Sequence, residues 1–512
     1  MTKYKCKGWG TCHQYLTDIG ILTITSDANG DFAGYILQYA GNTYTGNDRD
    51  ELVSLFDTLT EDLNIRSDNS RDIILVYVKN LSLVKAYLPY EKNKCTNNYI
   101  LSGNIEFRSW ENFTKMDAEA VMQDWSKIFE RDKYPYLTPA QMPRKQLQYL
   151  LKNEPDNVYP PLIQLPLISK GVHGGICYAR DQQLHTDMYG FDLVSAYIYS
   201  IAFKKHACEA PKFINTDLWD AYINAEDYGT IGRYKITYTC VFSAISCFKD
   251  VNGNSIKTGT HTVDIVLSNI DLRTLLSIPA VTINSVECIT LFGFKLDYLP
   301  KTIRDYCIDL FMQKQSAVKD SAEYKRIKVI LNSGLFGNFL YSMNKILEAD
   351  DRNKAYKLEN KSLCPQWGIF TMAYVKQIIF GIGIKAVEWV YSDTDSVYCK
   401  NDTFNTKLFN EYNNDVLARN IELCEVFGYP IEAAKLGTFD APELITRLIA
   451  NKRKQYWYET TTGSVVVKAA GCDKKQFDNI DPETIFTGNW IPPVGERHYV
   501  TWTEGKYFDL AK

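Results

Sequence analysis

Residues 391–398 read YSDTDSVY, in which a single residue separates Asp393 from Asp395. The flanking stretches, KAVEWV and SVYCK, are rich in β-branched and aromatic residues and predict a β-hairpin with both aspartates at its tip. The same Asp-x-Asp spacing occurs at Asp48 and Asp50 in a loop-like segment, and aspartate is a common turn residue. The spacing alone therefore does not identify a metal site, and partners elsewhere in the chain must decide.

A third carboxylate belongs to the segment FDLVSAYIYS. Asp192 follows an apolar run and precedes a helical one, so we expect it at the C-terminal end of a strand. By itself it could equally cap the helix that follows. Together with Asp393 and Asp395 it would suit Mg²⁺, which favours one or two carboxylates completed by phosphate oxygens and water. Two such ions roughly 3.5–4 Å apart support phosphoryl transfer, in which the protein mainly positions charge.

The segment KRIKVILNSGLFGNF carries the groups that would bind the rest of a nucleotide. Lys328, Asn332 and Phe336 are spaced by four residues, which puts them along one face of a predicted helix. The lysine would meet a phosphate, and the other two side chains a sugar and a base. An amphipathic helix with a solvated lysine has the same spacing. This segment alone therefore does not identify a nucleotide site, and it must be considered together with the other two segments.

The composition restricts the classes of protein that fit. The 512 residues suffice for several domains, and the net charge of −4 with a pI near 6.0 leaves nucleic-acid binding to local basic patches. Thirteen cysteines without a C-x-x-C pair, and no signal-peptide pattern at MTKYKCKGWG, predict reduced thiols and a cytoplasmic location, in a bacterial host if a phage encodes the chain. No apolar run approaches the length of a membrane span.

Several elements must position these residues. Residues 20–95 alternate strand-like and helix-like runs in an α/β pattern, and a helix is expected at about 112–131. Prolines gather in residues 132–170, which predicts a domain boundary. From Pro300 to about Asn344 the pattern is strongly helical.

In this order, the three segments resemble the motifs of family B DNA polymerases. DLVSAYIYS resembles motif A, Asp-x-x-Ser-Leu-Tyr-Pro-Ser, KVILNSGLFG resembles motif B, Lys-x-x-x-Asn-Ser-x-Tyr-Gly, and YSDTDS matches motif C, Tyr-x-Asp-Thr-Asp-Ser, at every specified position. The resemblance covers about residues 150–512. It implies an α+β multidomain fold, a right-hand polymerase with palm, fingers and thumb, and an N-terminal domain of ribonuclease H-like exonuclease type.

Two departures from these motifs stand out. In motif A, Ala196 and Ile198 replace the usual leucine and proline, which are apolar exchanges. Motif B contains one extra residue, so that Leu335 takes the place of the usual tyrosine and Phe336 is displaced by one. On a helix both remain near the Lys328–Asn332 face, and we expect Phe336 to substitute for the tyrosine.

The resemblance also assigns roles to residues. Asp192, Asp393 and Asp395 would be the catalytic residues and the ligands of two Mg²⁺ or Mn²⁺ ions. Tyr197 would be the steric gate against a ribose 2′-hydroxyl, although AYIYSIA also permits a core tyrosine. The nucleotide-binding set would be Ser195, Tyr197, Lys314, Lys328, Asn332 and Phe336. The DNA-binding set would be Gly174, Gly175, Lys454, Tyr456 and Lys468.

Further matches resemble the protein-primed, phage-type branch of the family, among them VDIVLSNIDLRTLL, QWGIFTMAYVKQIIF, and HGG with Val172 in place of a tyrosine. The implied organisation has seven parts. They are a degenerate exonuclease-like domain (1–140), a linker and palm with motif A (141–203), a first terminal-protein-region-like insertion (204–300), fingers with motif B (301–340), a short second insertion (341–366), palm with motif C and Lys-x-Tyr (367–467), and thumb (468–512).

The exonuclease site of the family would need four carboxylates for two metal ions. The first-strand Asp-x-Glu is absent from ILTITSDANGD, and Val84 stands where the resemblance expects an aspartate. Asp124 is the one candidate remnant of the exonuclease carboxylates. Asp117 and Glu119 lie in a predicted helix, where helix capping explains these two acids better. We expect no proofreading from this domain, which would instead guide single-stranded template.

The sequence thus predicts a DNA-directed DNA polymerase that binds template, primer and dNTPs, with a terminal protein as a candidate primer. A polymerase that starts without template or primer, as in a defence system, remains an alternative. A reverse transcriptase fits less well, because that class has adjacent aspartates in the hairpin. The alternative that is not an enzyme is a nucleic-acid-binding scaffold derived from a polymerase, against which the three intact aspartates count.

Overall fold

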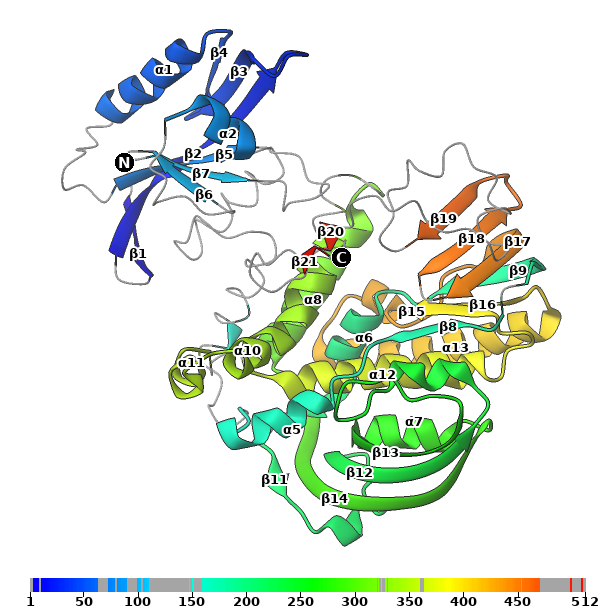
Figure 1. The fold of residues 1–512 in the computed structure, drawn as a ribbon. Helices are drawn as coiled ribbons and strands as arrows, with labels where there is room; N and C mark the ends of the chain where they lie inside the picture. The colour runs from blue at the N-terminus through cyan, green and yellow to red at the C-terminus, as the bar shows by residue number, and fades with distance from the viewer. Residues whose placement is uncertain are drawn as a thin grey trace. The chain divides into compact units, whose positions relative to one another are not determined.

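A computed structural model describes residues 3–8, 11–62, 72–78, 81–89, 99–102, 105–109, 147, 150–151, 159–181, 183–319, 321, 324, 327–328, 330–359, 363–452, 454–469, 498–499 and 508–509 (Figure 1). The chain divides into two compact units. The first consists of Met1–Met142, Ala317–Ile330 and Val500–Tyr507, and the second of Pro143–Ser316, Leu331–Tyr499 and Phe508–Lys512.

The first unit is built on a mixed sheet with the strand order β4-β3-β2-β5-β7-β6, and β1 pairs with β2. Its strands are β1 (Lys3–Gly8), β2 (Thr11–Ser26), β3 (Phe32–Tyr39), β4 (Asn42–Gly46), β5 (Asp72–Val78), β6 (Tyr99–Ser102) and β7 (Ile105–Ser109). Strand β5 runs parallel to β2 and β7, and helices α1 (Arg49–Asp62) and α2 (Leu81–Tyr87) share its apolar core. The α/β pattern expected for residues 20–95 is confirmed, whereas the helix expected at 112–131 lies outside the described residues.

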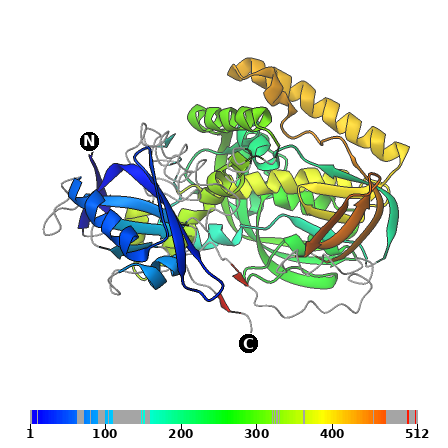
Figure 2. The ribbon, with the colours of Figure 1, turned by 90° about the horizontal axis from the view of Figure 1, so that it is seen from above.

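The second unit contains an antiparallel sheet with the order β19-β18-β17-β9-β16-β15-β8. Its strands are β8 (Ile176–Ala179), β9 (His185–Asp192), β15 (Tyr391–Thr394), β16 (Ser396–Lys400), β17 (Glu443–Lys452), β18 (Gln455–Thr460) and β19 (Val465–Ala469). Helices α6 (Ala196–Phe203) and α12 (Pro365–Gly383) pack together beside it, and the long α13 (Thr403–Phe427) runs along the outside of this unit (Figure 2).

The hairpin expected around Asp393 and Asp395 is confirmed, because β15 and β16 pair through Tyr391 and Tyr398. Our prediction that KAVEWV forms its first strand is wrong. Residues 385–390 form turns and irregular chain after α12. Trp389 holds this segment by donating its indole N–H to Ser392 Oγ at 2.8 Å, and buries its ring there instead of extending the strand.

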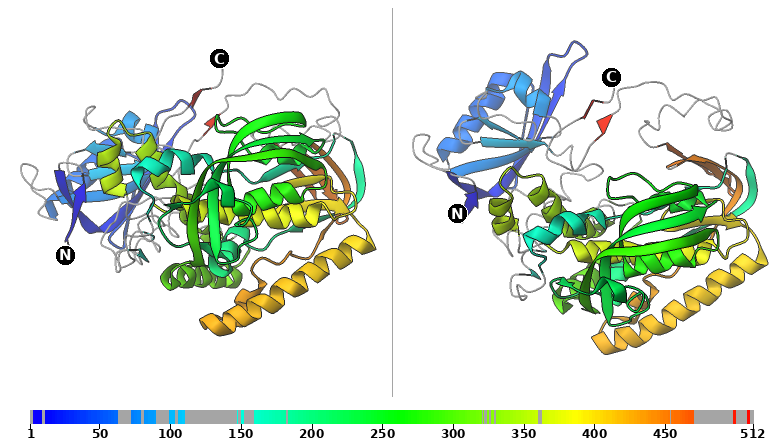
Figure 3. Two further views of the ribbon diagram at one scale, coloured as in Figure 1. Left: turned by 90° about the horizontal axis from the view of Figure 1, so that it is seen from below. Right: turned by 60° about the horizontal axis from the view of Figure 1, so that its bottom comes forward.

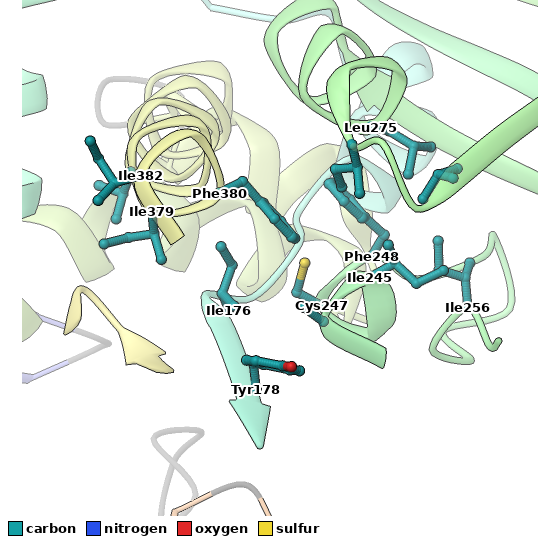
Figure 4. Packing of buried hydrophobic residues seen from close by; sticks show 14 of the residues in the cluster. Ile176, Tyr178, Ile245, Cys247, Phe248, Ile256, Leu275, Ile379, Phe380 and Ile382 are labelled. Atoms are coloured by element: carbon teal, nitrogen blue, oxygen red, sulfur yellow. The ribbon is translucent and has the colours of Figure 1, made fainter. Parts of the chain in front are cut away.

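A second, strongly curved sheet has the order β10-β14-β12-β13, with β11 beside β14 (Figures 1 and 3). It comprises β10 (Lys205–Ala207), β11 (Lys212–Phe213), β12 (Tyr228–Cys240), β13 (Gly259–Ser268) and β14 (Val281–Tyr298), and α7 (Asn269–Ser277) packs between it and α12. Figure 4 shows Phe380 of α12 pointing toward Cys247 and Phe248, at the end of the 3-10 helix (Ser243–Cys247) that follows β12. One apolar core therefore joins the curved sheet to the first sheet of this unit.

Most of the remaining described elements are helical. They are α5 (Leu165–Lys170), α8 (Lys301–Ser316), a π-helix (Ile330–Phe336), α10 (Gly337–Leu347) and α11 (Arg352–Glu359). The stretch 341–366, where we expected a second insertion, contains the end of α10 and α11. No helix among the described residues is long and apolar enough to cross a membrane.

Two buried histidines make the stability of the second unit depend on pH. His173 Nε2 lies 2.7 Å from the carbonyl oxygen of Val266 and its Nδ1 accepts the Lys249 N–H, while His206 lies 3.0 Å from Thr371 Oγ1. Burial lowers the pKa of both imidazoles to about 4. As the pH falls, these histidines are protonated in the unfolded chain at a higher pH than in the folded one. The free energy of unfolding therefore decreases between about pH 6.5 and about pH 4, by about 1.4 kcal/mol per pH unit for each histidine.

We expect the urea midpoint of the parent to fall steeply over this pH window, and the slope to be smaller in the double variant His173→Gln/His206→Gln. The exposed His261 is the matched control, and His261→Gln should leave the slope unchanged. Equal slopes in the double variant and the parent would contradict the assignment of buried, neutral imidazoles.

Candidate active site

The backbone brings Asp192 and the hairpin aspartates to the same end of neighbouring strands. Strand β9 ends at Asp192, which is the register partner of Ser396 at the start of β16. The Leu193 N–H donates to the carbonyl oxygen of Asp395 at 2.9 Å, and the Asp440 N–H donates to that of Asp192 at 2.9 Å. Asp192 is exposed, whereas Asp393 and Asp395 are partly buried. The position expected for Asp192 at a strand end is confirmed.

Asp393 is held from two sides. Its backbone N–H donates to Ser396 Oγ at 3.1 Å, within the hairpin. Its register partner on β8 is Cys177, whose thiol donates to Asp393 Oδ1 at 3.5 Å. Nothing in the sequence indicates Cys177 beyond its place two residues after Gly175, because the contact depends on the pairing of β8 with β15.

Backbone strain is stored next to the carboxylates. Ser195 at the start of α6 has φ = 47°, and Thr394 between the two hairpin aspartates has φ = 68°. Residues other than glycine rarely adopt this left-handed region, and such strain persists only where the surroundings enforce it. Hydrogen bonds of Val194 with Gly437 and Thr438, at 2.9 and 2.8 Å, provide that enforcement beside Ser195.

Gly175 lies directly against the hairpin tip. A Cβ at this position would come within 2.7 Å of Thr394 Cγ2 and 3.1 Å of its Cα, whereas a Cβ at Gly174 would meet nothing within 4 Å. The two glycines that the sequence suggested as DNA-binding residues therefore have different surroundings. Gly175 allows the close packing of β8 on Thr394, which keeps Asp393 and Asp395 in place.

We expect Gly175→Ala to displace the hairpin tip and lower primer extension by about a hundredfold, since a 1 Å misplacement of reacting groups has effects of this size. Gly174→Ala is the matched control and should stay within about threefold of the parent, because its methyl group enters open space. Steady-state extension and primer-template affinity should be measured for both. Equal losses of affinity in both variants would contradict the packing role and support DNA contacts at both glycines.

The residues expected to bind the triphosphate and sugar lie around motif A. Lys314 of α8 donates from Nζ to Ser195 Oγ at 3.1 Å. The ring of Tyr197 stacks on that of Phe336, with 4.4 Å between the ring centres and 6° between the planes. Burial, and then the charge of Asp395, raise the pKa of the Tyr197 hydroxyl, which stays protonated beside the carboxylates. The structure thus brings four residues of the expected nucleotide-binding set together: Ser195, Tyr197, Lys314 and Phe336.

The extra residue in motif B is accommodated by the π-helix. A π-helical turn holds one residue more than an α-helical turn, so an insertion there leaves the following helix in register. Leu335 is fully buried, and Phe336 is left facing Tyr197. Asn332 is exposed on this helix. Lys328 is also exposed, but it belongs to the first unit.

The residues expected to hold DNA lie on β17, β18 and β19. Lys454 forms the turn between β17 and β18 with φ = 52°, and its N–H donates to the Tyr391 hydroxyl at 3.2 Å. Lys468 is exposed on β19, opposite Tyr456. Tyr456 itself is only 7% exposed and packs 4.7 Å from the ring of Tyr391. Its ring therefore supports the hairpin of β15 and β16 rather than offering an open face to a nucleic acid.

The donor set fits a divalent metal that substrate completes. Within the described ranges, no three or more His, Cys, Asp or Glu side chains form a group that would hold a metal ion alone. The strand ends nevertheless carry Asp192 and Asp395, whose carboxylate oxygens are hard ligands, and Asp393 lies two positions before Asp395. Mg²⁺ and Mn²⁺ suit such a set, because Mg²⁺ commonly keeps water and substrate phosphates in its coordination shell.

The predicted exonuclease positions are only partly described. Val84 lies in α2 of the first unit and is fully buried in its apolar core. Asp124, Asp117 and Glu119 lie outside the described residues.

These features define an α+β, multidomain fold of the kind found in DNA polymerases. The particular likeness is to phi29 DNA polymerase. Its ternary complex with primer-template DNA and incoming nucleotide matches with a TM-score of 0.63 and 14% identity, over 91% of this chain and 94% of that one. Its post-translocation binary complex with primer-template DNA matches with a TM-score of 0.60 and 13% identity, over the same shares.

By sequence, no protein-family model and no curated protein matches the chain. At 13–14% identity the likeness to the phi29 enzyme concerns the fold.

Proposed function

We propose that this protein is a DNA-templated DNA polymerase that adds nucleotides at the site formed by Asp192, Asp393 and Asp395. The observation that carries the proposal is the in-register pairing of β9 with β16, which joins motif A to the motif C hairpin. The fold supports it, because the similar phi29 structures are complexes of a DNA polymerase with primer-template DNA, one of them also with incoming nucleotide.

Each group has a task in this reaction. Asp192 and Asp395 would hold the divalent ions, and Asp393 keeps the hairpin in place through its contacts with Ser396 and Cys177. When bound, Mg²⁺ or Mn²⁺ would supply charge stabilisation for the triphosphate and lower the pKa of the attacking hydroxyl. Lys314 and Ser195 bind the phosphates of the incoming dNTP.

The stacked rings of Tyr197 and Phe336 form a rigid wall beside the expected sugar position. A ribose 2′-hydroxyl would collide with this wall, so deoxynucleotides are favoured. The neutral Tyr197 hydroxyl adds no charge next to the carboxylates, since burial raises its pKa.

The finer parts of the proposal concern priming and origin. The curved sheet of β10–β14 with α7 lies in residues 205–298, the place of the first terminal-protein-region-like insertion, and it is a candidate surface for a priming protein. The natural nucleophile would then be a hydroxyl of a terminal protein, in a phage or linear mobile element replicated in a bacterial cytoplasm. Val84 in place of an acid supports a first unit without proofreading activity.

The test is extension of a 5′-labelled primer on single-stranded template by the full chain, with dNTPs and Mg²⁺ or Mn²⁺, and sequencing of the products. Template-directed products support the proposal. Products made without template or primer favour the alternative of a defence-type polymerase. If the chain binds primer-template but extends neither a DNA primer nor a candidate terminal protein, the scaffold alternative is left. The same labelled strand, incubated without dNTPs, should stay intact if proofreading is absent.

A further inference from the structure

The second unit contains a pocket that the proposed polymerase site does not use. Its volume is about 420 Å³, and it lies among α6, α7, α12, α13 and the strands β10 and β14. None of the residues assigned to catalysis, nucleotide binding or DNA binding lines it. Pockets for small ligands commonly measure about 300–1,000 Å³, so this one is large enough for a ligand of nucleotide size.

Four cations line this pocket: Lys205, which is paired with Asp227, and Lys204, Arg273 and Arg419. Among the described residues, no carboxylate forms an ion pair with Lys204, Arg273 or Arg419. Of the acids nearby, Glu226 is exposed on the lining, and Asp227 is already paired with Lys205. The pocket therefore carries an excess of positive charge.

The partners that hold these cations are neutral. The Lys204 ammonium lies 5.2 Å from the ring centre of Tyr199 and 5.8 Å from that of Tyr374. The Arg273 guanidinium donates at 3.1 and 3.2 Å to the side-chain oxygen of Gln377, with this amide oriented accordingly. Aromatic rings and amides fix the direction of a cation without cancelling its charge.

The ionisation of Lys204 agrees with an unfilled requirement for an anion. Burial, together with the charges of Arg419 and Arg273, lowers its pKa to about 8. Burying a cation among like charges is unfavourable unless an anion compensates. The tyrosine rings and amides on the same lining would suit the rest of an organic ligand.

We propose that this pocket binds a phosphorylated small molecule of the nucleotide class, with its phosphates on Lys204, Arg273 and Arg419. Arginine and lysine bind phosphate by charge-assisted hydrogen bonds, and the rings and amides contact the remainder. This proposal does not depend on polymerase activity, because the residues of the two sites are different.

The test is calorimetric titration of the full chain with ATP, with inorganic pyrophosphate and with adenosine, in EDTA so that metal-dependent binding at the polymerase site is suppressed. ATP and pyrophosphate should bind, and adenosine should not. Two variants, Arg419→Ala and Lys204→Met, should each weaken ATP binding by about tenfold, the effect of one lost charge-assisted contact. Arg419 is exposed, so its exchange leaves the hydrophobic core undisturbed. Thermal melting of both variants checks that they fold.

Two controls separate the effect of Lys204, Arg273 and Arg419 from that of other basic side chains. Lys205→Ala removes the lysine of the lining that Asp227 already neutralises, and Lys314→Met removes the phosphate contact expected at the polymerase site. Both should leave ATP affinity within about twofold, as for exposed or unrelated charges. ATP binding that is absent, or unchanged in both pocket variants, would overturn the proposal. So would a short single-stranded oligonucleotide that binds more tightly than ATP and depends on the same residues.

Discussion

Asp395→Asn should abolish primer extension and leave folding intact. The exchange keeps the shape of the side chain and the backbone carbonyl that accepts the Leu193 N–H at 2.9 Å, but removes the negative charge. A metal ion contributes several kcal/mol of charge stabilisation to the transition state, so we expect the rate to fall by about a thousandfold or more. Rates should be measured with saturating primer-template and dNTPs, beside the melting temperature and the primer affinity of the variant.

The control is Asp217→Asn, an equally conservative exchange at an exposed acid before β12. It should extend primers at the rate of the parent. If Asp395→Asn also retained that rate, Asp395 would not be a metal ligand and the proposed site would be wrong. If the variant lost primer affinity together with activity, the residue would act in DNA binding instead.

Lys376→Met should destabilise the second unit by about 3–5 kcal/mol, the usual effect of leaving one charge of a buried pair without its partner. Lys376 Nζ lies 2.9 Å from Asp271 Oδ1, and the two side chains are 1% and 0% exposed. The pair joins α12 to α7 and is thus part of the attachment of the curved sheet. After the exchange, Asp271 retains the Ser268 hydroxyl at 3.1 Å but no cation.

Urea unfolding of the parent and the variant measures this effect. The double variant Lys376→Met/Asp271→Leu should recover much of the loss, because replacing both charges by apolar groups removes the unpaired one. The exposed pair Lys407 and Glu411, 3.7 Å apart, is the matched comparison, and Lys407→Met should change stability by less than about 1 kcal/mol. A Lys376→Met variant as stable as the parent would show that Asp271 is protonated or solvated in the native state.

The sequence predicted those parts of the site whose residue types are dictated by chemistry. Asp192, Asp393 and Asp395 were predicted because a metal needs carboxylates at rigid strand ends, and the structure shows that the pairing of β9 with β16 brings these strand ends together. Lys314 and Ser195 were assigned by the resemblance, and they are in contact in the structure.

What could not be predicted depends on tertiary packing. The segment KAVEWV has the composition of a strand, but Trp389 is buried against the hairpin and the chain there is irregular. Tyr456 reads as a surface residue among lysines, yet it is buried under Tyr391. The pair of Lys376 and Asp271 joins residues 105 positions apart, and neither has a local pattern that indicates the other.

The π-helix at residues 330–336 has a consequence for tracing the history of this chain. Inserting one residue into an α-helix would turn everything after it by about 100° and expose the buried face of α10. A wide turn absorbs the insertion, so Phe339, Met343 and Ile346 remain buried in α10. Relatives with and without the extra residue would then share the same packing while their sequences fall out of step by one position. In this region, relatives should therefore be aligned by structure before their sequences are compared.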